Sequence, residues 1–264
     1  MLDLKMAILD RFSRNDLETA LIRRSYRELG LIDRTFHDGI YNTGNIKWHI
    51  KEKHLEALFK RSYEEVMDSI SIHVQGECDE NKLMLIKSFR KIVTLDLAYS
   101  YLGQVVDREE RVYPGLYFPK HFFAEDGSEK DLRYSRAPVD IRGKVVIETP
   151  YNTHKWIEHI KRSDDLDAEK YEAGVPSYYP ELNVLVQGAG SIHRTAESFL
   201  NQRDGTAMAH IYEDEELYNH LKTDGYSWFN SHTGEKIDGY HINDYRFAVI
   251  FSLRQMERDL ESPK

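Results

Sequence analysis

The amino-acid sequence predicts an α+β protein, with a helical N-terminal domain followed by a small mixed-sheet domain. Before residue 110, apolar residues recur every three or four positions and proline does not occur. All seven prolines and most of the glycines come after that point, together with short runs rich in β-branched residues. We therefore expect a helical domain over residues 1–110 and an α+β domain over residues 111–264.

Three helices are expected in the first domain. Asn15 and Asp16 can cap the first, and Gly30 stands where its C-cap is expected. The second runs from about Lys47 to Ile72 and ends at the stretch HVQGECDEN. The third carries Leu83, Ile86, Phe89, Ile92, Val93 and Leu97. Their wide apolar stripes predict a homo-oligomer that forms through this half of the chain.

The second domain is expected to alternate short strands with helices. Its β-rich runs are Val112–Phe118, Val139–Glu148, Val184–Gln187 and Ala207–Glu213. Two helices are expected among them, at Trp156–Arg162 and Ser191–Asn201. A last helix, Tyr245–Leu260, begins after Asn243 and Asp244, either of which can serve as its N-cap.

The most informative stretch is VLVQGAGSIHRTAESF, residues 184–199, which combines a strand, a glycine turn and a helix start. Gly188 and Gly190 allow backbone N–H groups to approach an anion, and a helix N-terminus adds a positive dipole end. Arg194 offers a bidentate fork for phosphate oxygens, and His193 offers a second donor. Ser191 can act as N-cap or phosphate ligand. The stretch therefore predicts a phosphate-binding site.

The same stretch resembles the ParB/sulfiredoxin superfamily, in which a glycine followed by a His-Arg or Arg-Arg pair grips nucleotide phosphates at a helix N-terminus. Gly190, His193 and Arg194 fill those places, and Ala196 is the small helix residue. The upstream APVDIRGKVVIETPYNTHKW is similar to the family's strand and polar corner, with Val139–Ile141 or Val145–Ile147 as the strand. Pro150, Asn152 and Lys155 would form the corner. The resemblance covers roughly residues 137–215 and suggests a bacterial or phage-related setting.

What the resemblance implies is binding of a nucleoside triphosphate, with or without Mg²⁺. The nucleotide-binding residues would be Gly188, Gly190, Ser191, His193, Arg194 and Asn152. A reaction, if the protein is a nucleotide hydrolase or phosphotransferase, would be attack on a phosphate by water or a substrate hydroxyl. Glu148 is the candidate base, and His193 is the second candidate catalytic residue.

Three alternatives remain open at this point. Gly188-Ala189-Gly190 begins a dinucleotide-binding fingerprint, although His193 replaces its third glycine. The glycine turn can also be purely structural, with Ser191 as a helix cap. The domain can also serve as a non-catalytic interaction module, because the acid that precedes the His pair in the kinase-like members of the superfamily is missing.

A metal site is not expected. His193 and Glu197 share one helical face and could hold a cation together with Glu148, but such a pair is more often a surface salt pair. The single cysteine, Cys78, excludes an internal disulfide framework and a multi-cysteine zinc site.

Composition narrows the choice of partners and location. The net charge is −9, and the chain is 31% charged and 41% hydrophobic. This charge argues against nucleic-acid binding through a basic surface, although residues 1–110 are nearly balanced, with 17 Lys and Arg against 19 Asp and Glu. No membrane-spanning run and no signal peptide are found in the sequence, which predicts a cytoplasmic protein without a membrane partner.

Overall fold

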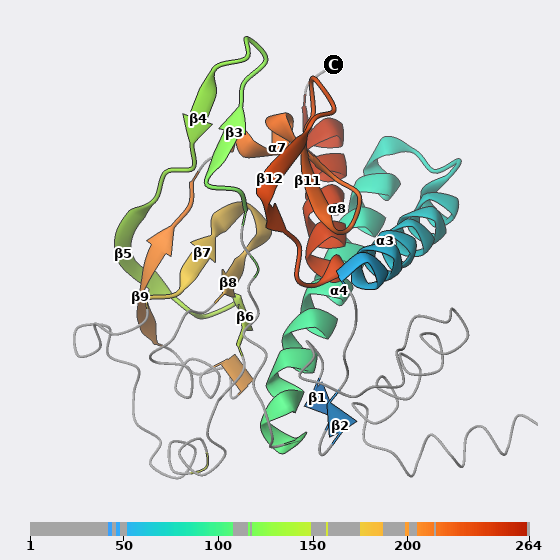
Figure 1. The fold of residues 1–264 in the computed structure, drawn as a ribbon. Coiled ribbons are helices and arrows are strands. Elements are labelled where there is room, and N and C mark those ends of the chain that lie inside the picture. The colour runs from blue at the N-terminus through green and yellow to red at the C-terminus, as the bar shows by residue number, and fades with distance from the viewer. Residues whose placement is uncertain are drawn as a thin grey trace, which may run out of the picture.

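The computed structural model describes residues 42–43, 46–47, 52–107, 116, 118–148, 157, 175–186, 199–200, 205–213 and 215–262. The fold is α+β, as the sequence predicted: two long helices come first, and short strands with further helices follow (Figure 1). Residues 108–115, which contain the predicted domain boundary, lie outside the described residues.

The first two described helices are α3 (Glu52–Val74) and α4 (Asp79–Asp107). Helix α3 begins five residues later than predicted, because Ile46–Lys47 (β2) pairs with Asn42–Thr43 (β1) in a short antiparallel hairpin. The predicted break is confirmed, since α3 ends at Val74 and Gly76 adopts a positive φ of 82°. Asp79 and Glu80 stand in the first turn of α4, where acids favour the helix dipole.

The central sheet has five strands in the order β5-β9-β7-β8-β6. They are β5 (Ser135–Asp140), β9 (Thr206–Ile211), β7 (Ser177–Tyr179), β8 (Val184–Val186) and β6 (Val145–Ile147). The sheet is mixed: β5–β9 and β7–β8 are antiparallel, whereas β9–β7 and β8–β6 are parallel. The β-rich run Val139–Glu148 therefore divides into two strands at opposite edges of the sheet, separated by a turn in which the Lys144 N–H donates to the Ile141 carbonyl at 3.1 Å.

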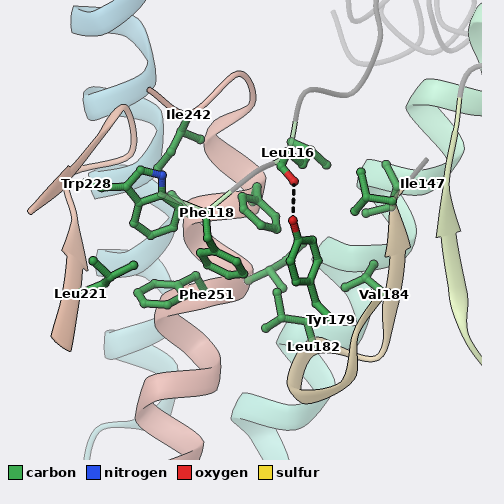
Figure 2. Close-up of a cluster of buried hydrophobic side chains, with 14 of the residues drawn as sticks. Leu116, Phe118, Ile147, Tyr179, Leu182, Val184, Leu221, Trp228, Ile242 and Phe251 are labelled. Carbon is green, nitrogen blue, oxygen red and sulfur yellow. Dashed lines mark hydrogen bonds between the residues drawn. The ribbon is translucent and has the colours of Figure 1, made fainter. Parts of the chain in front are cut away.

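The main core lies between this sheet, α4 and the C-terminal helix α8 (Tyr245–Glu261), and Figure 2 shows its aromatic centre. Phe118 lies 5.0 Å from Tyr179, 5.3 Å from Trp228 and 5.6 Å from Phe251, measured between ring centroids. Leu97, Ala98 and Tyr101 of α4 belong to the same buried cluster. Large aromatic side chains in contact dominate the energetics of a core. One core thus joins the helical part to the strands, while independent folding of residues 111–264 stays a prediction.

Two smaller sheets complete the C-terminal part. One is the hairpin β3 (His121–Phe123) and β4 (Glu129–Asp131), and the other is β10 (Leu221–Thr223), β11 (Ser227–Asn230) and β12 (Lys236–His241), which follows α7 (Leu217–His220). The turn between β10 and β11 packs on α3. A Cβ atom at Gly225, whose φ is +94°, would lie 2.5 Å from the Tyr63 Cβ atom. Glycine is therefore required there.

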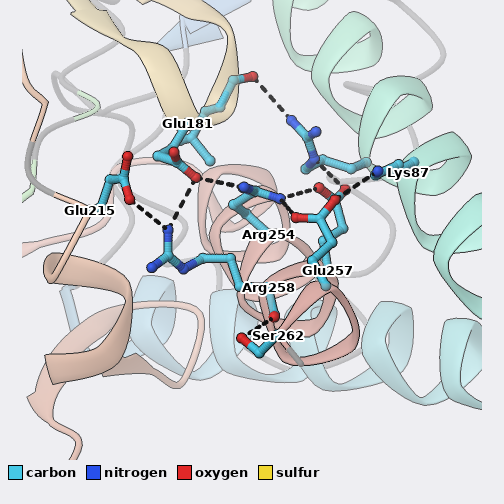
Figure 3. Close-up of polar contacts among 10 residues, drawn as sticks. Lys87, Glu181, Glu215, Arg254, Glu257, Arg258 and Ser262 are labelled. Atoms are coloured by element: carbon cyan, nitrogen blue, oxygen red, sulfur yellow. Dashed lines mark hydrogen bonds and ion pairs between the residues drawn. The ribbon is translucent and has the colours of Figure 1, made fainter. Parts of the chain in front are cut away.

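Helix α8 confirms the predicted last helix and its cap. The Asp244 side chain accepts a hydrogen bond from the Arg246 N–H at 3.0 Å. Near the other end, Arg254 and Glu257 enter a network of ion pairs with Glu181 of the 3₁₀ turn η2 (Pro180–Leu182) and with α4 (Figure 3). Arg90 of α4 donates to the fully buried Glu257 at 2.6 Å. The network links α4, η2 and α8.

Several predicted elements lie outside the described residues in whole or in large part. They are the helix over Asn15–Gly30, the strand Val112–Phe118, and the helices Trp156–Arg162 and Ser191–Asn201. In the predicted strand Val112–Phe118, the structure describes Leu116 and Phe118, which are core residues outside any strand. In the predicted helix Ser191–Asn201, the structure describes Phe199 and Leu200, and both are helical.

Candidate functional site

The sheet edge at which β6 and β8 end is the candidate functional site. The two strands are parallel neighbours, and Ile147 of β6 is the register partner of Val186 of β8. Glu148 follows Ile147 directly, and Gln187 and Gly188 follow Val186 directly. The structure therefore brings Glu148 to the same edge as Val186, the last described residue before the predicted phosphate segment. The carboxyl ends of parallel strands are where open α/β sheets bind ligands.

Residues of two further strands, β7 and β9, lie at the same edge of the sheet. Ser177, the first residue of β7, pairs with Val186 on one side and with His210 of β9 on the other. Ser177 is buried, and the His210 N–H donates to the Pro176 carbonyl at 2.8 Å. The sequence analysis missed Ser177, because no pattern in the neighbouring sequence indicates that β7 lies between β8 and β9.

Glu148 is fully buried, with 0% of its surface exposed. Side chains alternate between the faces of a strand, so Glu148 shares a face with Val146 rather than with Ile147. That face carries the apolar cluster of Val146, Leu185 and Ala209, against which Phe199 packs. Its carboxyl group stands where β6 ends, at the edge described above, which makes Glu148 a candidate for a role in this site.

The Glu148 face also carries Tyr178 of β7, which packs against the same cluster. Burial raises the pKa of the Tyr178 phenol above its ordinary value. The Lys144 ammonium lies 5.1 Å from the centre of the Tyr178 ring, within the range of a cation–π contact. Tyr178 therefore stays a neutral phenol at ordinary pH.

The other predicted site residues lie outside the described part of the chain. They are Asn152, Gly188, Gly190, Ser191, His193, Arg194 and the candidate cation ligand Glu197. Phe199 is described, and it packs against clusters on both faces of the sheet. Val186 ends β8 at the candidate edge, and Phe199, thirteen residues later in the chain, packs on the sheet again.

Among the described residues, no group of three or more His, Cys, Asp or Glu side chains could hold a metal ion. His220 and His232 form a close pair, with Nδ1 of the first 2.8 Å from Nε2 of the second. Their ring centroids are 5.1 Å apart, so the two nitrogens lie roughly on the line between the rings. This is the geometry of a hydrogen bond and not of two ligands arranged around one ion. The pair ties α7 to the turn after β11, and Phe122 stacks on the His220 ring.

Within the described ranges, no helix has both the length and the apolar character needed to cross a membrane.

The comparisons with known proteins place the chain in one family. The model described as "Family of unknown function (DUF6710)" matches residues 45–262, and the chain belongs to that family. The matched range runs from β2 to the end of α8, so the unit shared by the family includes both the long helices and the sheets. Neither the curated proteins nor the solved structures contain a match to the chain.

Proposed function

We propose that this protein binds a nucleotide through its phosphates at the edge where β6 and β8 end. The observation that supports the proposal is the register of Ile147 with Val186, since Glu148 directly follows the first and the segment Gly188–Arg194 begins two residues after the second. The segment supplies glycines for backbone approach, a guanidinium and an imidazole. These are the groups that recognise a phosphate.

The ligand we propose is a nucleoside triphosphate, with or without Mg²⁺. Arg194 and His193 would hold phosphate oxygens, and Gly188, Gly190 and Ser191 would present backbone N–H groups. Asn152 would add a side-chain amide, since it comes only four residues after Glu148 in the chain. The resemblance of these residues to the ParB/sulfiredoxin superfamily supports this proposal.

Turnover would add one step. Glu148 would take the proton of a water or a substrate hydroxyl as its oxygen attacks the terminal phosphorus, while the bond from phosphorus to the bridging oxygen breaks. Mg²⁺, when bound, would neutralise charge on the phosphates. Since Glu148 is fully buried, a nucleophile reaches its carboxylate only if ligand binding exposes this face.

The same burial favours a second candidate function, a binding protein without turnover. A fully buried carboxylate can stabilise the site without contacting a reacting atom. The two candidates differ in one measurement, because only the first predicts release of inorganic phosphate from the bound nucleotide.

The experiment that tests binding is a thermal-shift panel on the full chain with ATP, GTP, CTP, UTP and NAD, each with and without Mg²⁺. A ligand at a hundredfold excess over its Kd stabilises the native state by about 2.7 kcal/mol. For a chain of this size we expect a rise of roughly 5–10 °C in Tm with at least one triphosphate. A shift with NAD alone would support the dinucleotide alternative. No shift with any ligand would mean that the proposal is wrong.

We also propose that the protein self-associates through one face of α4. Met84, Ile92 and Tyr99 are exposed there, and their spacings of eight and seven residues place them on one side of the helix. A single helix face buries less than a standard interface, so the association should depend on concentration. Sedimentation should show oligomer at roughly tens of micromolar. Ile92→Asp should give monomer, and a monomeric parent protein would contradict the proposal.

A further inference from the structure

In the hairpin of β3 and β4, one edge of β4 has no strand partner among the described residues. The hairpin is a two-stranded sheet of its own and projects from the rest of the molecule (Figure 1). The Leu132 N–H donates to the Lys120 carbonyl at 2.7 Å, which fixes the hydrogen-bonding pattern of the hairpin. Main-chain groups of successive strand residues point to opposite sides, so those of Glu129 and Asp131 point away from β3. These two residues form the β4 edge.

A pocket of about 630 Å³ lies along the β4 edge. Its lining carries four carboxylates and two cationic side chains, which gives it a net charge of −2. The carboxylates belong to Glu129, Asp131, Glu213 and Glu216, and the cations to Lys130 and Arg133. A cationic occupant would complement this charge, whereas an acidic peptide or a nucleic acid would be repelled.

The carboxylates of the β4 edge can accept a further cation. Lys130 pairs with Glu216, and His121 Nδ1 lies 2.6 Å from an Asp131 oxygen, so these groups already have partners. The side chains of Glu129 and Asp131 nevertheless stay 60% and 74% exposed. Glu129 is the less engaged of the two, because its nearest oxygen lies 3.6 Å from His121 Nδ1.

An aromatic ring at the same pocket adds a second group that binds cations. Tyr134 lines the pocket and is 56% exposed. The centre of its ring lies 4.4 Å from that of His210 and 5.4 Å from that of Tyr212, so packing on the sheet supports it. An ammonium or guanidinium group is attracted to the face of such a ring.

We propose that the β4 edge binds an extended peptide with lysine or arginine at alternate positions, as a third strand of the hairpin. The peptide main chain would pair with the N–H and C=O groups that point away from β3. Glu129 and Asp131 are two residues apart, so their side chains share one face and would stand beside alternate residues of the peptide. Opposite charges in such neighbouring positions stabilise strand pairing.

A second copy of the chain does not fit this edge. If two β4 strands paired antiparallel about Lys130, Glu129 of each copy would stand beside Asp131 of the other. Like charges in these positions destabilise the pairing, and charged side chains on an edge strand commonly prevent self-association. The same carboxylates that exclude a second copy favour a basic strand.

The test is the binding of a fluorescent hexapeptide of alternating lysine and threonine to the full chain, measured by fluorescence anisotropy. Binding should saturate, and hydrogen exchange at the Glu129 and Asp131 amides should slow in the complex. A peptide of alternating glutamate and threonine should not bind. The lysine peptide with N-methyl groups on its lysine nitrogens in the main chain keeps its charge but cannot donate to the edge, so it should bind roughly tenfold more weakly.

Glu129→Lys tests the edge itself. It replaces an attraction by a repulsion at an exposed position, so it should weaken binding of the lysine peptide roughly five- to tenfold. Glu125→Lys is the matched control, since it makes the same change of charge at an exposed position of the same hairpin but outside the pocket. Because salt screens exposed charges, it should weaken binding less than about twofold at physiological ionic strength.

Three results would overturn the proposal. The first is that the lysine peptide does not bind the full chain. The second is equal binding of the N-methylated peptide, which would make the contact one of charge alone. The third is an equal loss of affinity in Glu129→Lys and Glu125→Lys. None of the residues that line this pocket belongs to the proposed nucleotide site, so each of these outcomes leaves the test of nucleotide binding unaffected.

Discussion

Replacement of Glu257 by glutamine tests the ion network that joins α4 to α8. The Glu257 carboxylate is fully buried and accepts hydrogen bonds from Arg90 at 2.6 Å and from Arg254 at 2.9 Å. Glutamine keeps the shape of the side chain and removes its charge. Two guanidiniums that are only 19% and 15% exposed then lose the anion between them. Figure 3 shows Glu257 within this group of charged side chains, next to Arg254.

Breaking a buried pair costs about 3–5 kcal/mol when the remaining charge has no other partner. Here Arg254 keeps Glu181 and Arg90 keeps the Leu182 carbonyl. We therefore expect a cost at the lower end, about 3 kcal/mol, in the free energy of unfolding measured by urea denaturation with circular dichroism.

The matched control is Glu65→Gln, which removes the charge of an exposed i,i+4 pair with Arg61 at 2.7 Å. Such pairs contribute only about 0.3–0.5 kcal/mol. If Glu257→Gln costs no more than Glu65→Gln, the network does not couple α4 to α8 and the reasoning is refuted.

Further predictions concern a turn, the buried phenols and the candidate base. Gly225→Ala should lower the free energy of unfolding by more than about 2 kcal/mol, because it adds a contact at 2.5 Å to the cost of a positive φ. Gly234 also has a positive φ but has open space around it, so Gly234→Ala should cost about half as much. Burial raises the pKa values of Tyr63, Tyr101 and Tyr218. The unfolded chain therefore loses these protons first, and stability should fall as the pH rises above about 10, with the phenolate absorbance of these three tyrosines appearing only on unfolding. Glu148→Gln should leave nucleotide affinity unchanged or tighter and abolish any phosphate release, whereas retained turnover would remove Glu148 as the base.

Local patterns in the sequence predicted the local structure well. The run Tyr245–Leu260 matches α8 almost to the residue, and Asp244 is its cap because a short acidic side chain precedes an apolar run with helical spacing. The break after Val74 is also confirmed, since glycine and polar residues interrupt the stripe of α3. These signals lie within a few residues of the feature they specify.

Non-local pairing was not predictable from the sequence. Nothing around Ser177 indicates that β7 lies between β8 and β9, because the choice of neighbours depends on packing across the whole sheet. The sequence singled out Glu148 as an acid close to a strand end, but its complete burial follows from the residues of other strands on the same face. The shared core of Leu97 with Trp228 likewise crosses the predicted boundary, since a change in composition does not show which elements pack together.

The most direct test of the central claim is the affinity of the full chain for its preferred nucleotide before and after Arg194→Ala, measured by isothermal titration calorimetry. Loss of the charge-assisted fork should weaken binding by roughly 1.5–3 kcal/mol, about ten- to a hundredfold. Arg61→Ala, which removes an exposed guanidinium on α3, should leave the affinity unchanged. Equal affinities in the parent protein and in Arg194→Ala would contradict the assignment of the phosphate site to the segment that follows β8.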